Sequence, residues 1–335
     1  MTETACGGPC SKAGPAPFSV GGDLYGCIWC LVSMIPKGRV TTYGRIARAL
    51  GDQAAARAVG KALSRNPRAP DIPCHRVVMA DGGLGGYAFG AENKSLRLKS
   101  EGVDVGESGV DLGVYGWDYA HPPAPLKKVA EEQRKLGEEE RTLVHEWSFS
   151  SQVAVDVFYG GEEVGYERAC ASAVFLRGND LKVATSVCEV TSPYVPAYLH
   201  LREAGPVTSA LDSLASSFGE DVQTFFTSND AVLLVDGDGF MHPRRFGFAS
   251  SLGYALGIPT IGVAKSLLLG QVVGQDVIDG GEVVGRLVKG RTPSGNRFFV
   301  SAGHAVSLNS AIKLVGDSYP RSLFLAHEKA RCSFQ

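Results

Sequence analysis

The chain has 335 residues with a formal net charge of −2, and 44% of its residues are hydrophobic. This length accommodates two domains, and the near-neutral charge means that any nucleic-acid-binding surface must be local. The eight cysteines are too sparse for a secreted disulfide scaffold. The N-terminus lacks the apolar core of a signal peptide, and no stretch reaches the roughly 18 apolar residues of a membrane span. We therefore expect a cytoplasmic monomer with reduced thiols and no membrane contact.

Changes in composition divide the chain into four segments. Residues 1–22 are rich in Gly, Pro and Ser and predict a flexible tail, whereas 23–104 predict a compact domain. Residues 105–124 have the Gly and Pro content of a linker, and 125–332 form the second domain. The charged start of that domain, 126–143, predicts a solvated helix packed along its edge.

The segment PKGRVTTYGRIARALGDQAAARAVGKALSRNPR predicts a helix-turn-helix. Thr41 or Thr42 can cap a first helix that ends at Gly51, and a second helix runs from about Gln53 to Arg65. The segment holds eight basic side chains and one acid, and small residues line its second helix. This pattern is typical of a helix pair that enters a DNA groove. The alternative is a solvated basic helix pair without function.

Cys74 follows in the motif IPCHRVV. A lone cysteine is commonly a small buried hydrophobe, but it can also be a nucleophile. The motifs IPKGRVTTYGRIARAL, ARAVGKALSRNP, IPCHRVV and GGLGGYAFG…K…EGV together resemble the O6-alkylguanine-DNA alkyltransferase family over residues 24–104. The resemblance implies a winged-helix-like fold and single-turnover transfer of an alkyl group from O6-alkylguanine to Cys74. The alternative is a damage sensor without chemistry.

The same resemblance implies roles for the residues around Cys74. His75 would activate the thiol through a water, Glu101 would orient the imidazole, and Tyr43 would help to protonate the leaving guanine. The implied DNA-contacting residues are Arg57, which fills the space of the flipped base, Asn66, which shapes the turn before the thiol, and Tyr87, whose loop closes over the base.

Two other cysteine pairs have spacings that metal ligands can have. Cys27 and Cys30 fall on a predicted helix whose neighbours are apolar, and Cys6 and Cys10 fall in the tail. No clear histidine ligand lies nearby in the sequence. We therefore favour unliganded thiols or a disulfide over a structural zinc site.

From about residue 147 the sequence predicts an α/β domain. Short runs such as VAVDVFY, AVLLVD and PTIGVA are typical of strands, and VGRLV with RFFVSA predicts a hairpin in a mixed sheet. Asp156 interrupts one apolar run and Asp236 ends another. Two buried acids at neighbouring strand ends suit Mg²⁺, with Mn²⁺ as an alternative, and phosphodiester hydrolysis. The alternative is that one aspartate caps a turn and the other pairs with an arginine.

The motifs SPYVPAYLHLREAGP, VDGDGFMHPRRFGFASSLGYALGIPTIGVAKSLLLG and FVSAGHAVSL resemble endonuclease V. The resemblance covers residues 115–330. It implies an RNase H-like α/β/α domain with a five-stranded mixed sheet. It also implies Mg²⁺-dependent nicking of double-stranded DNA at the second phosphodiester on the 3′ side of deoxyinosine. Inosine-containing RNA is the alternative substrate.

By this resemblance Asp156 and Asp236 bind the metal and Glu203 is the catalytic glutamate. Lys265 would contact the scissile phosphate, and His327 would lie near the metal. The implied lesion-binding residues are the strand-separating wedge Pro193, Tyr194, Val195 and Pro196, with His242, Gly237 and Gly239 in the pocket for the flipped base.

The chain also departs from the endonuclease V pattern. Asp238 stands where glutamine or histidine is usual, and Ala197 replaces a glycine after the wedge. LREAGP carries one more residue than the common form, and the family's proline after the distal strand is replaced in DSYPRSLFLAH, the segment that contains His327. We expect these changes to affect rate and lesion preference rather than reaction class. The sequence thus predicts a fusion of two DNA repair enzymes, each of which raises the local concentration of the other on DNA.

Overall fold

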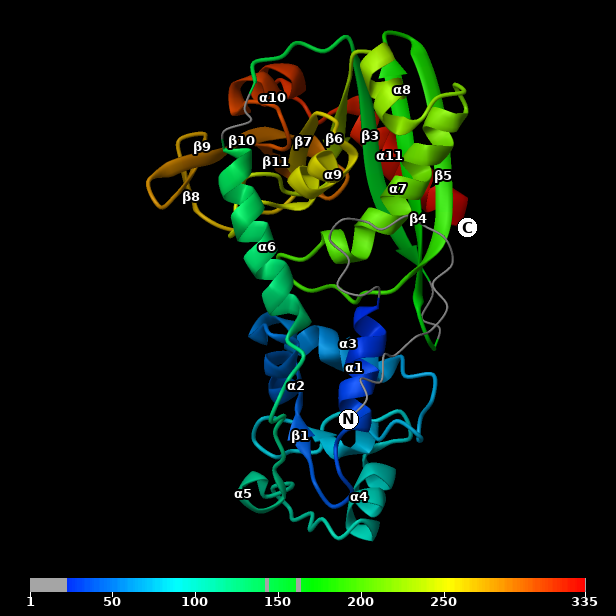
Figure 1. The fold of residues 1–335 in the computed structure, drawn as a ribbon, viewed down its shortest axis with the longest axis vertical. Coiled ribbons are helices and arrows are strands. Elements are labelled where there is room, and N and C mark those ends of the chain that lie inside the picture. The colour runs from blue at the N-terminus through cyan, green and yellow to red at the C-terminus, as the bar shows by residue number, and fades with distance from the viewer. Residues whose placement is uncertain (1–22, 142–144, 161–163, 335) are drawn as a thin grey trace.

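The computed structural model describes residues 23–141, 145–160 and 164–334, which form a helical first domain and a larger α/β second domain (Figure 1). The first domain contains α1 (Leu24–Ser33), β1 (Thr41–Thr42), α2 (Tyr43–Leu50), the 3₁₀ turn η1 (Gln53–Ala55), α3 (Ala56–Ser64), the 3₁₀ turn η2 (Cys74–Arg76), β2 (Val77–Val78), α4 (Ala91–Ser100) and α5 (Leu112–Tyr115). Helix α6 (Pro125–Glu140) then runs from this domain to the next.

The second domain is built on one mixed sheet with helices on both faces. Its strands are β3 (Ser151–Gly160), β4 (Glu167–Arg177), β5 (Asp180–Val190), β6 (Ala231–Val235), β7 (Thr260–Ala264), β8 (Gln271–Val273), β9 (Asp276–Asp279), β10 (Glu282–Thr292) and β11 (Gly295–Ala302). Its helices are α7 (His200–Ser216), α8 (Val222–Ser228), α9 (Phe248–Leu256), α10 (Leu308–Val315) and α11 (Arg321–Phe334).

The expected helix-turn-helix is formed by α2, η1 and α3. The Thr42 hydroxyl caps α2 by accepting a hydrogen bond from the backbone N–H of Arg45 at 3.2 Å. Gly51 ends the helix in the left-handed conformation, with φ of 99°. Asp52 then accepts a hydrogen bond from the N–H of Ala54 and so starts the second helical segment. The local capping chemistry therefore fixes the turn between the two helices.

The segment 105–124, expected as a linker, packs on the first domain. The N–H of Val110 donates to the carbonyl of Gly82 at 2.9 Å, and the Tyr119 hydroxyl donates to the carbonyl of Leu31 at 3.0 Å. These contacts form because the segment carries apolar and aromatic residues as well as glycine and proline. The chain therefore passes between the domains as helix α6 rather than as an open loop. The expected tail, 1–22, lies outside the described residues.

The sheet has nine strands rather than the expected five. Among the described residues its order is β5-β4-β3-β6-β7-β11-β10-β9-β8, and the first five strands form the core of the sheet. The predicted hairpin of β10 and β11 extends this core because β11 pairs antiparallel with the open edge of β7, and β9 and β8 continue it. The prediction of a mixed sheet is confirmed, and the expected five strands were too few because the hairpin and then β9 and β8 continue the sheet beyond β7.

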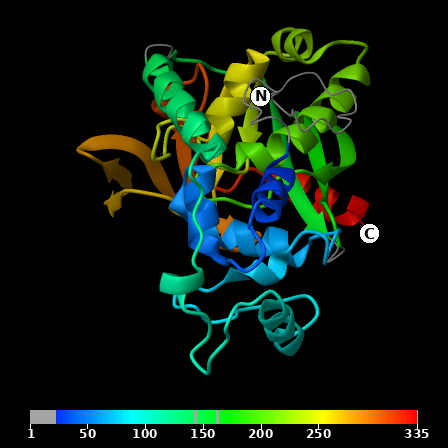
Figure 2. The same cartoon turned by 60° about the horizontal axis from the view of Figure 1, so that its bottom comes forward.

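The two domains share a hydrophobic core beside helix α6. The cluster that holds Trp29 and Leu50 of the first domain also contains Leu126 of α6 and Val195 and Tyr198 of the second domain. Figure 2, in which the first domain comes forward, shows its blue N-terminal helices near the start of α6. Within the described ranges, no helix is long and apolar enough to cross a membrane.

Candidate functional sites

The Cys74 thiol lies at the start of η2 and is 8% exposed. The side-chain amide of Asn66 donates to Sγ at 3.0 Å and to the carbonyl of Ile72 at 3.3 Å. Burial raises the pKa of the thiol, although the Asn66 hydrogen bond and the charge of Lys94 act in the opposite direction. The thiol is therefore protonated at neutral pH, and a base is needed to make it a nucleophile.

His75 is the base that this geometry offers. Its Nε2 lies 2.9 Å from Oε1 of Glu101, so the carboxylate holds the ring proton on Nε2 and leaves Nδ1 with a lone pair. Nδ1 is buried and has no hydrogen-bond partner in the part of the chain that the structure describes. Burial lowers the pKa of His75, so the imidazole is neutral near pH 7.

Glu101 is itself held by Arg76. The guanidinium of Arg76 donates to both carboxylate oxygens, at 2.8 and 2.7 Å. Burial alone would raise the pKa of Glu101, but the hydrogen bonds from Arg76 and His75 outweigh it and lower the pKa to about 2. No role was predicted for Arg76 from the sequence, although its position beside His75 in PCHRV was an available signal.

Lys94 is a second residue for which the sequence predicted no role. Its side chain is fully buried, and Nζ donates to the carbonyls of Val77 at 2.6 Å and Gly86 at 3.2 Å. Burial lowers the pKa of Lys94 to about 8, against the opposing effect of Cys74. Lys94 therefore ties the loop before Tyr87 to strand β2 and places a cation near the thiol.

The other predicted residues of this domain surround the thiol or lie on α3. Tyr43 is the first residue of α2, and its hydroxyl would lie 3.5 Å from a side chain added at Gly85, whose φ is +66°. The ring of Tyr87 contacts His75 edge-on at 6.2 Å. Arg57 is exposed on α3, the second helix of the pair. Tyr43, Tyr87 and the thiol thus line one site, while Arg57 faces solvent.

Of the four cysteines with metal-like spacing, Cys27 and Cys30 lie on α1, where Cys30 is exposed. Cys6 and Cys10 lie outside the described residues. The choice between unliganded thiols, a disulfide and zinc for these positions stays a prediction.

The second site lies where three strands of the sheet end. Asp156 is on β3, and Asp236 and Lys265 directly follow β6 and β7. Nζ of Lys265 is paired with Oδ2 of Asp236 and lies 3.6 Å from Oδ2 of Asp156. His327 of α11 places Nδ1 2.9 Å from Oδ2 of Asp156. The parallel pairing of β3 with β6 and of β6 with β7 brings these residues together from positions far apart in sequence.

The two aspartates have different environments. Burial opposes ionisation of Asp156, but His327 and Lys265 outweigh it and hold its pKa below the usual value. Burial and the neighbouring Asp156 raise the pKa of Asp236 to about 7, despite Lys265. Burial and the neighbouring Asp236 also raise the pKa of Asp238 to about 7. One oxygen of Asp238 is buried and has no hydrogen-bond partner in the described ranges.

Glu203 enters the same site from the first turn of α7. The Tyr159 hydroxyl of β3 donates to its carboxylate at 2.7 Å, and burial raises the pKa of Glu203 to about 8. The guanidinium of Arg202 lies 3.9 Å from the centre of the Tyr159 ring and is paired with Glu167 at 2.7 Å. Tyr159 was not predicted from the sequence, although it lies only three residues after Asp156.

A pocket of about 260 Å³ connects these carboxylates to the predicted lesion-binding residues. Its lining includes Glu203, Asp236, Gly237, Asp238, His242, Lys265, Tyr194 and Ala197. Gln133 of α6 also lines it, although the helix precedes the sheet. Half of the residues predicted for the second site therefore line one cavity, and Asp156 and His327 reach it through Asp236 and Lys265 rather than lining it.

The wedge residues alternate between buried and exposed positions. Pro193 and Val195 are buried, whereas Pro196 and Tyr194 are exposed, Tyr194 to 55%. Ala197 follows with φ of +65°, a left-handed conformation that favours glycine.

His242 is hydrogen-bonded to the residue that follows the wedge. Its Nδ1 accepts the backbone N–H of Arg244 at 3.2 Å, so Nε2 carries the proton and donates to the carbonyl of Ala197 at 3.1 Å. Burial lowers the pKa of His242 to about 3, which keeps the ring neutral.

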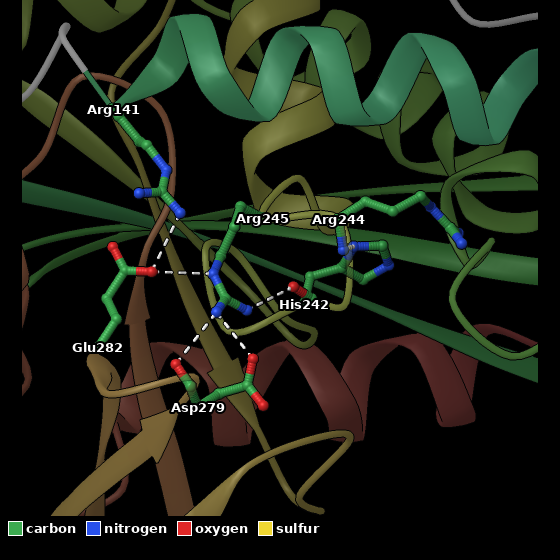
Figure 3. A network of polar contacts seen from close by, with 6 residues as sticks. All are labelled: Arg141, His242, Arg244, Arg245, Asp279 and Glu282. Carbon is green, nitrogen blue, oxygen red and sulfur yellow. Dashed lines mark hydrogen bonds and ion pairs between the residues drawn. The ribbon is translucent and has the colours of Figure 1, made fainter.

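The loop that carries His242 is fixed to the extended part of the sheet. Figure 3 shows Arg245 bonded to Asp279 at 2.7 Å and to Glu282 at 3.2 Å, while Arg141 reaches Glu282 at 3.1 Å. Gly137 of α6 also approaches this loop so closely that an added Cβ would lie 2.3 Å from the carbonyl of Arg244. The end of α6 and strands β9 and β10 therefore hold the pocket wall.

The donor set at the sheet edge suits a hard divalent cation. Asp156 and Asp236 present carboxylate oxygens, and the Lys265 ammonium is paired with both of them. The two carboxylates therefore already bind one positively charged group, and such oxygens are the ligands that Mg²⁺ prefers. In the described ranges no three His, Cys, Asp or Glu side chains are gathered as a ready ligand set. The fit of a cation therefore rests on the two aspartates.

The two sites define a protein in which a helix-turn-helix domain with a buried thiol is joined to a carboxylate-bearing α/β domain of the nuclease type. The family model for Endonuclease V matches residues 136–327, and the model for the 6-O-methylguanine DNA methyltransferase DNA binding domain matches 23–103. The chain belongs to the endonuclease V family, in the form that carries this methyltransferase domain.

Relatives with both domains span nearly the whole chain. A "Bifunctional methyltransferase/endonuclease" of Picrophilus torridus is 35% identical over 313 residues, covering 92% of this chain and 95% of that protein. Its counterpart in Thermoplasma volcanium is 32% identical over 325 residues, covering 92% and 90%. The crystal structure of the endonuclease V from Bacillus subtilis, 21% identical, covers 63% of this chain and 91% of that chain with a TM-score of 0.50, and it shows the same fold.

Proposed function

We propose that this protein is a bifunctional DNA repair enzyme. Its first domain transfers an alkyl group from O6-alkylguanine in DNA to Cys74, and its second nicks DNA on the 3′ side of deoxyinosine. The observation that carries the proposal is the presence of two complete sets of reactive groups in one chain: Cys74 with His75 and Glu101, and Asp156 with Asp236 and Lys265.

The first reaction follows from the positions of the proton acceptors. The thiol proton of Cys74 passes through a water to Nδ1 of His75, and Glu101 stabilises the imidazolium that forms. The thiolate then attacks the alkyl carbon, a C–S bond forms and the C–O6 bond breaks. The leaving guanine takes a proton from the Tyr43 hydroxyl. The product is a thioether that has no route back, so each molecule acts once.

The test of this reaction is the mass of the protein after incubation with duplex DNA containing O6-methylguanine. We expect an increase by one methylene group in the unmodified chain and none in Cys74→Ser. DNA binding without a mass change in the unmodified chain would favour the damage sensor.

The second reaction uses the residues of the sheet edge. Asp156 and Asp236 would hold Mg²⁺, for which Mn²⁺ is an alternative, and the cation would activate water and neutralise charge on the phosphate. Lys265 offers a positive charge to the scissile phosphate, and Glu203 lies in the pocket where it can position the attacking water. His327 holds Asp156 through its ring nitrogen.

The lesion-binding surface supports a flipped base as substrate. Tyr194 of the wedge is exposed and lines the pocket, and Gly237 and His242 line it as well. Arg57 on α3 would fill the corresponding space in the first domain, while Asn66 and Tyr87 shape its pocket. Double-stranded DNA with alkylguanine or deoxyinosine is therefore the proposed substrate class.

An end-labelled duplex with one deoxyinosine tests the second reaction directly. We expect a nick one nucleotide past the lesion that requires Mg²⁺ and disappears in Asp236→Asn, which keeps the size of the side chain but removes its charge. An RNA strand of the same sequence with inosine measures the alternative substrate. Faster cleavage of the RNA would assign the second domain to RNA.

A further inference from the structure

The wedge loop of the second domain is held on both sides by the first domain. Before the wedge, the N–H of Tyr25 in α1 donates to the carbonyl of Thr191 at 3.1 Å. Within it, Val195 is 1% exposed and belongs to the hydrophobic cluster that contains α1, α2 and α3. The loop that must separate DNA strands is thus packed into the core of the alkyltransferase domain.

A side-chain hydrogen bond to the first domain lies two residues after the wedge. Tyr198 is 2% exposed, and its hydroxyl donates to Oδ2 of Asp52 at 2.7 Å. The other oxygen of Asp52 accepts the N–H of Ala54, so one carboxylate both starts the second helix of the helix-turn-helix and binds the wedge loop. The guanidinium of Arg244 covers the other side of the Tyr198 ring at 4.3 Å.

These contacts stabilise the left-handed backbone conformation of Ala197. Ala197 lies between the wedge and Tyr198 with φ of +65°, which costs roughly 1–2 kcal/mol for a residue with a side chain. Its carbonyl accepts hydrogen bonds from His242 and Arg244, and Arg244 is in turn held by Gln133 of α6 at 2.7 Å. Asp52 and Gln133 both lie outside residues 136–327, which match endonuclease V.

We propose that the alkyltransferase domain positions the strand-separating wedge of the nuclease, with Tyr198 and Asp52 as positioning residues that couple the DNA-reading helix pair to lesion extrusion. The inference rests on the proposed nuclease function. A wedge is needed only when the lesion is paired, because a base in single-stranded DNA costs little to flip. The brace should therefore matter for duplex DNA and not for single strands.

The experiment compares Tyr198→Phe with the unmodified full-length chain on two substrates, a fully paired deoxyinosine duplex and the same labelled strand alone. The variant loses one hydroxyl and keeps the buried ring. We expect kcat/KM on the duplex to fall roughly 10- to 100-fold, as for loss of one hydrogen bond to a charged group, and to stay unchanged on the single strand. Fluorescence of 2-aminopurine beside the lesion should show less strand opening in the variant.

Tyr119→Phe is the matched control. It also removes a tyrosine hydroxyl that is hydrogen-bonded to the first domain, at the carbonyl of Leu31. We expect this variant to leave the ratio of kcat/KM on the duplex to kcat/KM on the single strand unchanged. An equal loss on both substrates by Tyr198→Phe, or no loss on either, overturns the inference. Failure of the unmodified chain to nick either substrate would instead overturn the proposed nuclease function.

Discussion

At the scale of single residues, the two sites depend on side chains whose charge is set by their neighbours. Glu101 keeps its charge because Arg76 and His75 bind both of its oxygens, and that charge selects the tautomer of His75. Glu203 has the opposite environment, where burial raises its pKa to about 8 and the hydrogen bond from Tyr159 partly offsets this. Reactivity in each site therefore depends on a residue that does not itself touch substrate.

Alkyl transfer should depend on pH through His75. Because burial lowers the pKa of His75 below the usual 6.5, the imidazole stays neutral and able to accept the thiol proton as pH falls from 8 to 6.5. We expect the single-turnover rate to be constant over this range and to decline only at lower pH. A decline centred at or above pH 6.5 would contradict the assignment of His75 as a buried neutral base.

Replacing Tyr159 by phenylalanine should slow nicking. The change removes the hydrogen bond to Glu203 and keeps the ring that packs against Arg202. Because the pKa of Glu203 is raised to about 8, its carboxyl is largely neutral near pH 7, and loss of the hydrogen bond is worth about 0.5–1.5 kcal/mol. This predicts a kcat roughly 2- to 10-fold lower with KM little changed.

Tyr319→Phe provides the comparison for Tyr159→Phe, because the Tyr319 hydroxyl has no hydrogen-bond partner among the described residues. Steady-state kinetics on the deoxyinosine duplex should show no loss of kcat in this variant. Similar losses in both variants would mean that Tyr159 has no specific role.

The candidate reactive residues could be predicted from the sequence, but the residues that support them could not. Cys74, Asp156 and Asp236 stand out because a thiol or carboxylate interrupts an apolar or tightly patterned stretch. Arg76, Lys94 and Tyr159 do not, because arginine, lysine and tyrosine are common residues whose partners become visible only after folding. For example, Lys94 bonds to a carbonyl 17 residues earlier in the chain.

At the scale of elements, most helices and strands were predictable because caps and apolar periods are local signals. Thr42, Gly51 and the proline after Asn66 define the helix-turn-helix. Strand β5 was missed because it is an outer strand with many exposed residues. The joining of β11 to β7 was missed because sheet pairing depends on contacts that no local pattern carries.

Ala197→Gly should stabilise the wedge loop. Glycine adopts φ of +65° without the steric cost of a Cβ atom, and it loses part of this gain to the entropy of the unfolded chain. We expect a net increase of roughly 0.5–1 kcal/mol in the free energy of unfolding, measured by denaturant titration.

The same substitution at Ala204, inside α7, should act in the opposite direction and destabilise by about 1 kcal/mol. Destabilisation by both changes would show that the backbone at Ala197 is not strained.

At the scale of the whole molecule, the shared core makes the two domains one cooperative unit. Val195 and Tyr198 of the second domain and Leu126 of α6 are buried among residues of the first. Calorimetry should therefore show one unfolding transition. Val195→Asp places a charge in the shared cluster and should separate the single unfolding transition into two, one for each domain. Two transitions in the unmodified chain would mean that the domains fold independently.

The central claim, that one chain carries two independent repair reactions, is tested by one duplex that holds both O6-methylguanine with a labelled methyl group and deoxyinosine. With Mg²⁺ present, the unmodified protein should take up the label and nick the strand past deoxyinosine. Cys74→Ser should lose only label transfer, and Asp236→Asn only nicking. Loss of both reactions in either variant, or of neither in both, would contradict the account.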